Sequence, residues 1–224
     1  MTHQHGKLTF IFEDQHLAVL SKPAGLLSQG EITGDENLVD LLRVHFGRNY
    51  VGLVHRLDRN TSGIMVVAKR TKSAQRLTDA LQSGRMKRTY LAWVEGELRG
   101  EVVWRHHLLK DEKKNLVRVH PSGSEAVLRA RPIRAGKWKT LKVTLIELEL
   151  ETGRSHQIRV QAAHEGYPLL GDVKYGSGTE ASRSFGRPAL HSHRLSFPHP
   201  MPKEGQEEVL HFEAPLPEDM TKPK

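Results

Sequence analysis

A succession of strand-like segments in the middle of the chain restricts the fold more than any other feature. The longest, residues 141–150, alternates apolar and polar side chains, so that Val143 and Leu145 face one way. The alternation changes phase near Ile146, which predicts a β-bulge or a strand end that is covered on both faces. Strands that follow one another with only charged turns between them are typical of an antiparallel sheet.

Segments elsewhere in the chain complete an α+β pattern. Further short strands are expected at residues 8–12, 16–20, 64–68, 88–95, 189–197 and 208–212. Helices are expected at residues 37–46, between Thr71 and Gly84, and at residues 154–165. Asp35 or Asn37 caps the first helix and Thr71 caps the second. This pattern predicts a mixed, mostly antiparallel central sheet flanked by helices and loops.

The composition restricts the partner and the compartment. The chain has 34 Lys and Arg against 26 Asp and Glu, and the net charge of +8 favours an acidic partner, with nucleic acid ahead of a membrane surface. There is no cysteine, which excludes disulfide scaffolds, thiolate zinc sites and cysteine nucleophiles. No signal-peptide core occurs, and no apolar stretch is long enough to span a bilayer. We therefore expect one cytoplasmic domain.

The run that ends at Gly63 carries the strongest chemical signal. It places Asp58 between Arg56 and Arg59, and a Thr-Ser-Gly turn and an apolar strand follow. Taken alone, an aspartate in this position is more often a turn residue that accepts hydrogen bonds from the next amides. Held in a cationic pocket, the same carboxylate suits an active site whose substrate is polyanionic.

The stretch from His55 to Lys69 resembles the second conserved motif of the RluA-like pseudouridine synthases. That motif runs His-Arg-Leu-Asp, two variable residues, Thr-Ser-Gly and an apolar strand, and every fixed position matches. Four further blocks resemble the family in content and order, at residues 20–26, 87–96, 152–172 and 190–200. Together the five blocks span about residues 8–213.

The resemblance implies the pseudouridine synthase fold and a single catalytic domain over residues 1–224. The core of that domain is expected at about residues 8–213, and residues 214–224 are expected to form a flexible tail. Many relatives carry a small RNA-binding domain ahead of the catalytic one. Because the catalytic pattern starts by residue 8 here, no such domain is expected.

The resemblance also implies an isomerase that converts uridine in RNA to pseudouridine. Asp58 is then the catalytic carboxylate, Arg159 is the guanidinium that pairs with it, and Tyr90 is the ring on which the flipped base stacks. Three roles for Asp58 stay open: it attacks carbon 1′ of the sugar, it attacks the ring, or it removes a ribose proton. Neither a cofactor nor a metal is expected, because the reaction involves no redox change and no net hydrolysis.

Five further residues are expected to bind the RNA: Arg56, Arg154, His156, Leu190 and Leu195. Arg56 is expected to wedge into the position that the flipped uridine leaves, because arginine both stacks and binds phosphate. Leu190 or Leu195 would form an apolar wall over the uracil.

Roles within the block at residues 152–172 stay open. On the expected helix His156 shares a face with Arg159, and it either orients that arginine, binds phosphate or is structural. Arg154 binds the substrate or lies on a solvated helix face. Gln161 stands where the family often has histidine, so this chain departs from the pattern there.

The expected partner is a stem-loop of ribosomal or transfer RNA, with no membrane, no obligatory protein partner and a monomeric protein. Two alternatives stay open. One is a non-catalytic RNA-binding protein on the same scaffold, and the other is a metal-dependent hydrolase that uses some of the 14 histidines. Pairs such as His191 and His193 lack a third ligand at a familiar spacing, so no metal site is expected.

Overall fold

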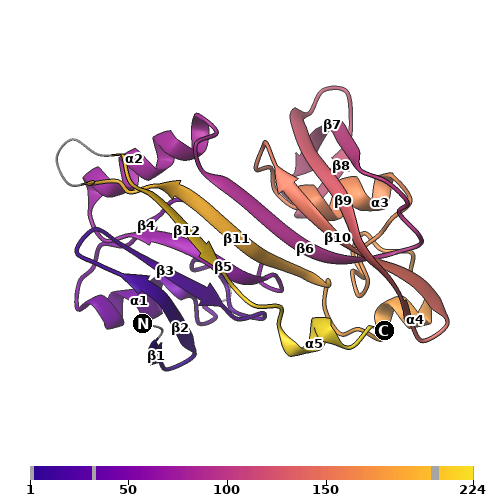
Figure 1. Cartoon of the computed structure of the whole chain (residues 1–224), viewed down its shortest axis with the longest axis horizontal. Coiled ribbons are helices and arrows are strands. Elements are labelled where there is room, and N and C mark those ends of the chain that lie inside the picture. The colour runs from indigo at the N-terminus through magenta and orange to yellow at the C-terminus, as the bar shows by residue number, and fades with distance from the viewer. Residues whose placement is uncertain (1–2, 32–33, 203–206, 224) are drawn as a thin grey trace. The chain divides into compact units, whose positions relative to one another are not determined.

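The computed structural model describes residues 3–31, 34–202 and 207–223 (Figure 1). The chain packs into two compact units, which we call the first unit (residues 1–88 and 192–215) and the second unit (residues 89–191 and 216–224). Strands β6 (Lys87–Glu95) and β11 (Leu190–Pro198) carry the chain from one unit into the other. Each unit is therefore built from two separate stretches of sequence.

The first unit contains an antiparallel sheet. Its strands are β1 (His3–His5), β2 (Leu8–Glu13), β3 (Leu17–Lys22) and β5 (Ser62–Ala68), which pair in that order. The short strand β4 (Gly52–Leu53) also pairs with β5, and β12 (Val209–Glu213) pairs with β11. The strands expected near residues 8, 16, 64 and 208 are therefore confirmed.

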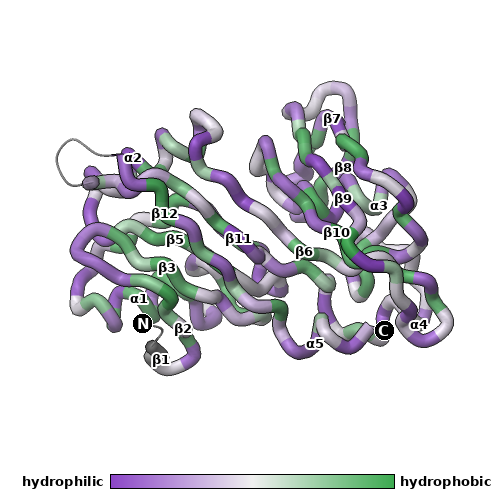
Figure 2. Tube along the Cα trace, in the orientation of Figure 1, coloured by the Kyte–Doolittle hydropathy of each residue, from purple (hydrophilic) through white to green (hydrophobic). Residues whose placement is uncertain are grey.

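Strand β5 lies at the centre of the first unit's core. All seven of its residues are buried, as a continuous apolar run predicts, and its tube is mostly green in Figure 2. Ile64 and Val66 pack in one hydrophobic cluster with Phe197 and with Leu77 of helix α2 (Thr71–Gln82). This buried strand begins four residues after Asp58, so it fixes where the loop that carries the carboxylate ends.

The cap predicted for the first helix of the first unit is confirmed, and the cap predicted for the second helix is wrong. Helix α1 (Leu38–Phe46) is capped by Asn37, whose side chain accepts a hydrogen bond from the Asp40 amide, as expected. Thr71 is not the cap of α2, because the extended Arg70 takes that position and its carbonyl accepts the first helical hydrogen bond, from Ala74. That helix starts without a side-chain cap.

The second unit contains an antiparallel sheet in the order β6–β10–β9–β7–β8. The bounds are β7 (Val102–Asp111), β8 (Leu116–Val119), β9 (Ser124–Trp138) and β10 (Leu141–Leu150). Leu145 pairs with Arg134 while Ile146 pairs with Pro132, which leaves Ile133 as an extra residue on β9. The bulge predicted near Ile146 is confirmed, and it sits beside a proline that has no amide hydrogen to donate.

Three helices lie in the second unit: α3 (Gln157–His164), α4 (Glu180–Arg183) and α5 (Glu218–Thr221). Where the sequence predicts a flexible tail, the described residues include α5, whose Met220 is fully buried. The indole Nε1 of Trp93 donates a 2.8 Å hydrogen bond to the Met220 carbonyl. Because a buried indole N–H requires an acceptor, this hydrogen bond holds α5 in place.

The sequence-based fold class is confirmed, since the strand pairs described within each unit are antiparallel and few helices accompany them. Among the residues that the structure describes, no helix is long and apolar enough to cross a membrane. In the same described ranges, no group of three or more His, Asp or Glu side chains is placed to hold a metal ion.

Candidate active site

Asp58 lies half-buried in a loop of the first unit that is fastened to the loop of residues 22–28. On one side of it, the Ser28 hydroxyl donates to the Leu57 carbonyl at 2.6 Å and accepts from the Leu57 amide at 3.2 Å. On the other side, the Gly25 amide donates to the Arg59 carbonyl at 2.8 Å. The backbone is thus held immediately before and after Asp58, which restricts where its carboxylate can point.

Lys22 strengthens the same connection from inside. It is fully buried, and its Nζ donates hydrogen bonds to the carbonyls of Pro23, Leu26 and Arg59 at 3.0, 2.7 and 3.1 Å. An ammonium group has three hydrogens to donate, so these three carbonyls satisfy it. Lys22 therefore links the loop of residues 22–28 to the Asp58 loop from the interior of the protein. Because it is buried, it does not contact RNA.

The two arginines beside Asp58 have different environments. Arg59 donates from Nη1 to Asp35 Oδ2 at 2.8 Å and from Nε to the Gly25 carbonyl at 3.1 Å, so it belongs to the loop structure. Arg56 is exposed, and no described residue forms a hydrogen bond or ion pair with it. This placement suits the expectation that Arg56, rather than Arg59, contacts the RNA.

His55 is a buried, neutral side chain. Its Nε2 accepts a 3.2 Å hydrogen bond from the Val66 amide of β5. Burial, together with the charge of Arg88, lowers the pKa of His55 from 6.5 to about 3. His55 therefore anchors the start of the motif to the core strand.

Gly63 ends the motif at a point where only glycine fits. Its φ is +117°, and a Cβ built there would lie 2.1 Å from the carbonyl oxygen of Ser192. The two backbones are also joined by a 3.0 Å hydrogen bond from the Ser192 hydroxyl to the Ile64 carbonyl. The glycine of Thr-Ser-Gly thus allows β11 to lie directly against the start of β5.

In the second unit Arg159 is held by a carboxylate that the sequence analysis missed. Its Nε and Nη2 donate to the two oxygens of Asp172 at 2.6 and 2.8 Å, and Asp172 is 1% exposed. Asp172 also accepts hydrogen bonds from the amides of Lys174 and Tyr175. The signal was present, because Asp172 ends the block at residues 152–172 and a buried arginine requires a carboxylate.

Tyr175 completes the support of Arg159. The guanidinium carbon of Arg159 lies 5.1 Å from the centre of the Tyr175 ring, within cation–π range. The Tyr175 hydroxyl lies 2.7 Å from Nδ1 of His156 and accepts a 3.0 Å hydrogen bond from the Val117 amide. His156 therefore contacts the same side chain that lies against Arg159, which is compatible with an orienting role and with a structural one, so the choice between its predicted roles stays open.

The helix predicted at residues 154–165 begins three residues later than expected, so His156 and Arg154 do not lie on a helix face. His156 is the cap of α3 and has a left-handed φ of 53°. The side chain of Gln157 folds back and accepts hydrogen bonds from the Thr152 hydroxyl and the Arg154 amide, both at 2.9 Å. These bonds hold residues 152–156 in a turn, which helical periodicity cannot reveal.

Gln161, where this chain departs from the family pattern, is a structural residue. It is fully buried, and its Nε2 donates to the carbonyls of Trp104 and Ala126 at 3.1 Å each. These carbonyls belong to β7 and β9. Gln161 thus ties helix α3 to two strands of the sheet.

The remaining predicted residues are also buried. Tyr90 on β6 is 5% exposed, and Leu190 at the start of β11 is 4% exposed. Leu195 is 1% exposed and belongs to the same core cluster as Ile64. The structure thus gives Leu195 a packing role, while the predicted contact of either leucine with uracil stays a prediction.

Asp58 and Arg56 belong to the first unit, and Tyr90 and Arg159 belong to the second. The ion pair expected between Asp58 and Arg159 therefore stays a prediction. The pair with Asp172 is compatible with it, because a guanidinium has five N–H donors and Asp172 engages only two of its nitrogens.

Comparison with known proteins agrees along almost the whole chain. Residues 16–164 match the family model described as RNA pseudouridylate synthase. An uncharacterized RNA pseudouridine synthase of Bacillus subtilis, YhcT, is 37% identical, and the alignment covers 97% of this chain and 71% of that protein. Ribosomal large subunit pseudouridine synthase D of Vibrio cholerae is 36% identical, with 95% of this chain and 68% of that protein covered.

Solved structures share the fold. Human RNA pseudouridylate synthase domain containing 1 superposes with a TM-score of 0.77 at 22% identity, over 96% of this chain and 86% of that one. Fold and sequence matches together define the class of enzyme: a pseudouridine synthase, which is an isomerase. The chain belongs to the RNA pseudouridylate synthase family, and its predicted kinship with the RluA-like enzymes is confirmed.

Proposed function

We propose that this protein converts uridine to pseudouridine in ribosomal RNA, with Asp58 as the catalytic carboxylate. The observation that carries the proposal is the Asp58 loop, whose backbone is fixed on both sides of the carboxylate. A rigid loop suits catalysis, because small displacements of a reacting group are costly. The names of two groups of relatives, ribosomal large subunit pseudouridine synthases C and D, support ribosomal RNA as the substrate.

The reaction breaks the bond between ribose carbon 1′ and ring nitrogen 1, and forms a bond between carbon 1′ and ring carbon 5. The proton on carbon 5 leaves and nitrogen 1 gains a proton, so the composition does not change. Asp58 has one of three roles in this reaction: attack on carbon 1′, attack on the ring, or removal of a ribose proton. Each of these routes requires the ionised carboxylate. The detached uracil must stay in a closed site until it rejoins the sugar.

Arg159 and Tyr90 supply the other parts of the proposed site. Arg159 stabilises the ionised form of Asp58 when the two meet, and its own geometry is set by Asp172 and Tyr175. Tyr90 offers a largely buried aromatic ring on which the uracil stacks. Leu190 is the apolar neighbour proposed to cover the base.

We further propose that the target uridine flips out of the RNA stack before it reacts. Unstacking costs a few kcal/mol, which contacts between protein and RNA offset. Arg56, exposed beside the fixed loop, is placed to fill the vacated position and to bind the phosphate backbone. Its lack of a partner among the described residues leaves the guanidinium ready for RNA.

The first test is Asp58→Asn, which keeps the shape of the side chain and removes its charge. We expect pseudouridine formation in a large-subunit ribosomal RNA transcript to fall below detection while RNA affinity changes less than about threefold. The assay follows tritium release from carbon 5 of labelled uridine, and a filter assay measures binding. Asp79→Asn, an exposed change in α2 with the same loss of charge, should retain full activity.

Three results would overturn parts of this proposal. Activity retained by Asp58→Asn would refute the role of Asp58. A parent protein that binds the transcript and leaves no pseudouridine would favour the non-catalytic RNA-binding alternative. Pseudouridine formed in transfer RNA transcripts and absent from ribosomal ones would change the substrate and keep the chemistry.

A further inference from the structure

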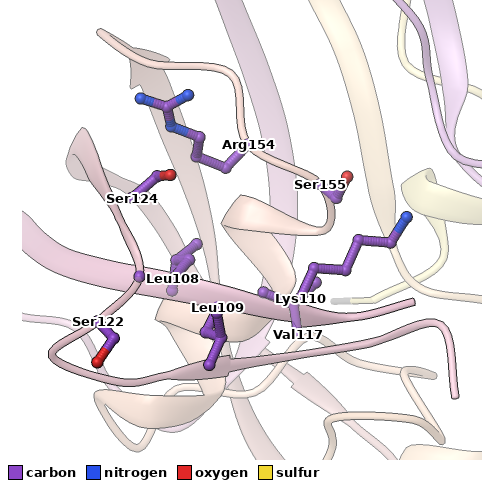
Figure 3. A pocket seen from close by; sticks show the side chains of 9 residues that line it. Leu108, Leu109, Lys110, Val117, Ser122, Ser124, Arg154 and Ser155 are labelled. Atoms are coloured by element: carbon purple, nitrogen blue, oxygen red, sulfur yellow. The ribbon is translucent and has the colours of Figure 1, made fainter. Parts of the chain in front are cut away.

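A pocket of about 230 Å³ opens on the second unit, in the part of the sheet farthest along the strand order from β6 (Figure 3). Leu108 and Leu109 of β7 and Val117 of β8 line it from below, although the Leu108 and Leu109 side chains point to opposite sides of their strand (Figure 3) and Leu108 and Val117 are core residues that are 5% and 4% exposed. Arg154 and Ser155, in the turn that precedes α3, form another wall. All of these residues belong to one unit, so the pocket exists within it.

Arg154 is fixed in place before any ligand arrives. Its amide donates to the side chain of Gln157 at 2.9 Å, and its Nε donates to the Glu125 carbonyl at 2.9 Å. No described residue takes up its two terminal nitrogens. A guanidinium that is held through Nε and open at its terminal edge is arranged to bind an oxyanion in two places.

Other groups at the rim add to this character. Lys110 also lines the pocket and forms an ion pair with the exposed Glu112. Because an exposed ion pair is weak, a stronger anion displaces Glu112 from Lys110. Ser122 and Ser124 also line the pocket, on either side of Gly123, and Ser124 is the first residue of β9 (Figure 3). Gly123 between them rests on the backbone of Leu108, where a Cβ would lie 2.4 Å from the carbonyl carbon.

The pocket is connected to the support of Arg159. Val117 in its wall donates its amide to the Tyr175 hydroxyl, and the Tyr175 ring lies against Arg159. Arg154 and Ser155 lead directly into His156, which contacts the same hydroxyl at 2.7 Å. The Tyr175 side chain therefore contacts both Val117, which lines the pocket, and Arg159.

We propose that this pocket binds a second nucleotide of the RNA substrate, separate from the uridine that reacts. Arg154 with Lys110 binds the phosphate of this nucleotide, and the base or ribose lies on the small apolar surface that the core residues Leu108 and Val117 leave exposed. At about 230 Å³ the pocket is smaller than the roughly 300–1,000 Å³ pockets of drug-sized ligands, so it holds no more than one nucleotide. The proposal rests on the proposed function, since it takes the substrate to be RNA.

The positive charge of the pocket and the space inside it can be tested with separate variants. Arg154→Gln removes the cation, and Ser122→Phe fills the space without any change in charge. With a large-subunit ribosomal RNA transcript, we expect each to raise KM and Kd roughly tenfold while kcat stays within about twofold. Arg154→Gln should also reduce the slope of log affinity against log salt by about 1, whereas Ser122→Phe should leave the slope unchanged.

Matched variants control for charge and position. Arg99→Gln removes the same charge from an exposed loop of the same unit, and Ser122→Ala changes the same residue without filling the pocket. Both should bind the transcript within about twofold of the parent. Thermal unfolding of every variant shows whether the fold is retained.

The outcomes separate the two proposals. Normal Kd and KM in both pocket variants would overturn the nucleotide site, and so would a fall in kcat alone, which would point to an effect on Arg159 through Tyr175. If the parent binds the transcript but does not modify it, the proposed function fails. Weaker binding by Arg154→Gln and Ser122→Phe would in that case still support the nucleotide site.

Discussion

At the scale of single residues, the most consequential contact is the one between Arg159 and Asp172. Both side chains are largely removed from water, with 11% and 1% of their surface exposed. The desolvation of each charge is offset only while the two hydrogen bonds between them persist. Asp172 is thus a positioning residue for the guanidinium on which the proposed chemistry depends.

Replacing Asp172 with Asn should therefore affect both stability and catalysis. Loss of the charge leaves Arg159 buried without its partner, and we expect a loss of about 3–5 kcal/mol in the free energy of unfolding. We also expect kcat to fall roughly 100-fold with little change in KM, because the guanidinium is no longer held. Urea unfolding and single-turnover rates measure the two effects.

A second ion pair of the same geometry serves as the control. Arg187 donates from Nε and Nη2 to Asp219 at 2.6 and 3.0 Å in the same unit, but Asp219 is 37% exposed. Asp219→Asn should cost less stability and leave kcat within about twofold. Equal effects of the two substitutions on kcat would show that Asp172 has only a structural role.

His55 makes a prediction about pH. Its pKa is about 3 in the folded protein and 6.5 for the unperturbed group, because burial and Arg88 both disfavour the charged ring. Between these values the unfolded chain binds a proton that the folded one does not, so stability falls as pH decreases below 6.5. The slope reaches at most about 1.4 kcal/mol per pH unit.

Urea unfolding at pH 7.5 and pH 5.0 measures this difference. His55→Gln retains an acceptor for the Val66 amide and cannot be protonated, so it should lose less stability between the two pH values than the parent. His107→Gln, on an exposed strand position, should behave like the parent. A pH difference that is equal in the parent and in His55→Gln would refute the buried neutral state.

Two partly buried carboxylates, Glu13 and Asp14, have lowered pKa values and titrate below the pH range of that measurement. Burial raises the pKa of Glu13, but hydrogen bonds and charges from Lys69 and His45 outweigh it, so the pKa lies below 4.5. Asp14 behaves similarly, since burial is outweighed by amide hydrogen bonds and by His199, and its pKa lies below 3.8. Both carboxylates contribute stability above their unperturbed pKa values, and it is lost only as pH falls through the lowered ones.

The residue scale also shows what the sequence could and could not predict. Motif positions alone predict the roles of Asp58, Arg56 and Arg159, and these roles stay predictions. Asp172 was missed, although it lies in a quoted block, because the turn that brings it back to Arg159 is a tertiary feature. The support of Lys22 was missed because its acceptors are backbone carbonyls, which leave no mark on the sequence.

At the scale of elements, the junction of β5 and β11 is the most constrained. Gly63→Ala would place a Cβ 2.1 Å from the Ser192 carbonyl in a backbone conformation that L residues rarely adopt. We expect a loss of stability greater than about 3 kcal/mol, measured by urea unfolding, or failure to obtain soluble protein. The start of β5 would have to shift, and Asp58 with it.

Gly100 provides a control of identical chemistry. A Cβ at Gly100 meets nothing within 4 Å, and its φ lies outside the left-handed region. Gly100→Ala should change stability by less than about 1 kcal/mol. If Gly63→Ala proves equally mild, the close approach of β11 to β5 is wrong.

Regular elements were the easiest part to predict. The continuous apolar run of β5 and the phase change at Ile146 both appear where periodicity places them. The start of α3 was predicted three residues early, because the left-handed His156 and the hydrogen bonds of Gln157 interrupt a pattern that is otherwise helical. Side-chain hydrogen bonds to the backbone decide such boundaries, and periodicity does not register them.

At the scale of the whole molecule, family membership was easier to predict than internal organisation. Five ordered blocks indicated the enzyme class, and the family model covers residues 16–164, which include parts of both units. The division into two units could not be predicted, because no linker or change in composition marks the places where the chain crosses from one unit to the other. The expectation of a single catalytic domain stays a prediction.

The interleaving of the two units has a consequence for how the protein is made. The first unit needs Leu195 and Phe197 to complete its core, and the second needs Met220 beside Trp93. A ribosome delivers all three long after it has delivered the strands that they cover. Neither core can close while the first 190 residues emerge, so both should form late, nearly together, and the nascent chain will expose apolar strands in the interval.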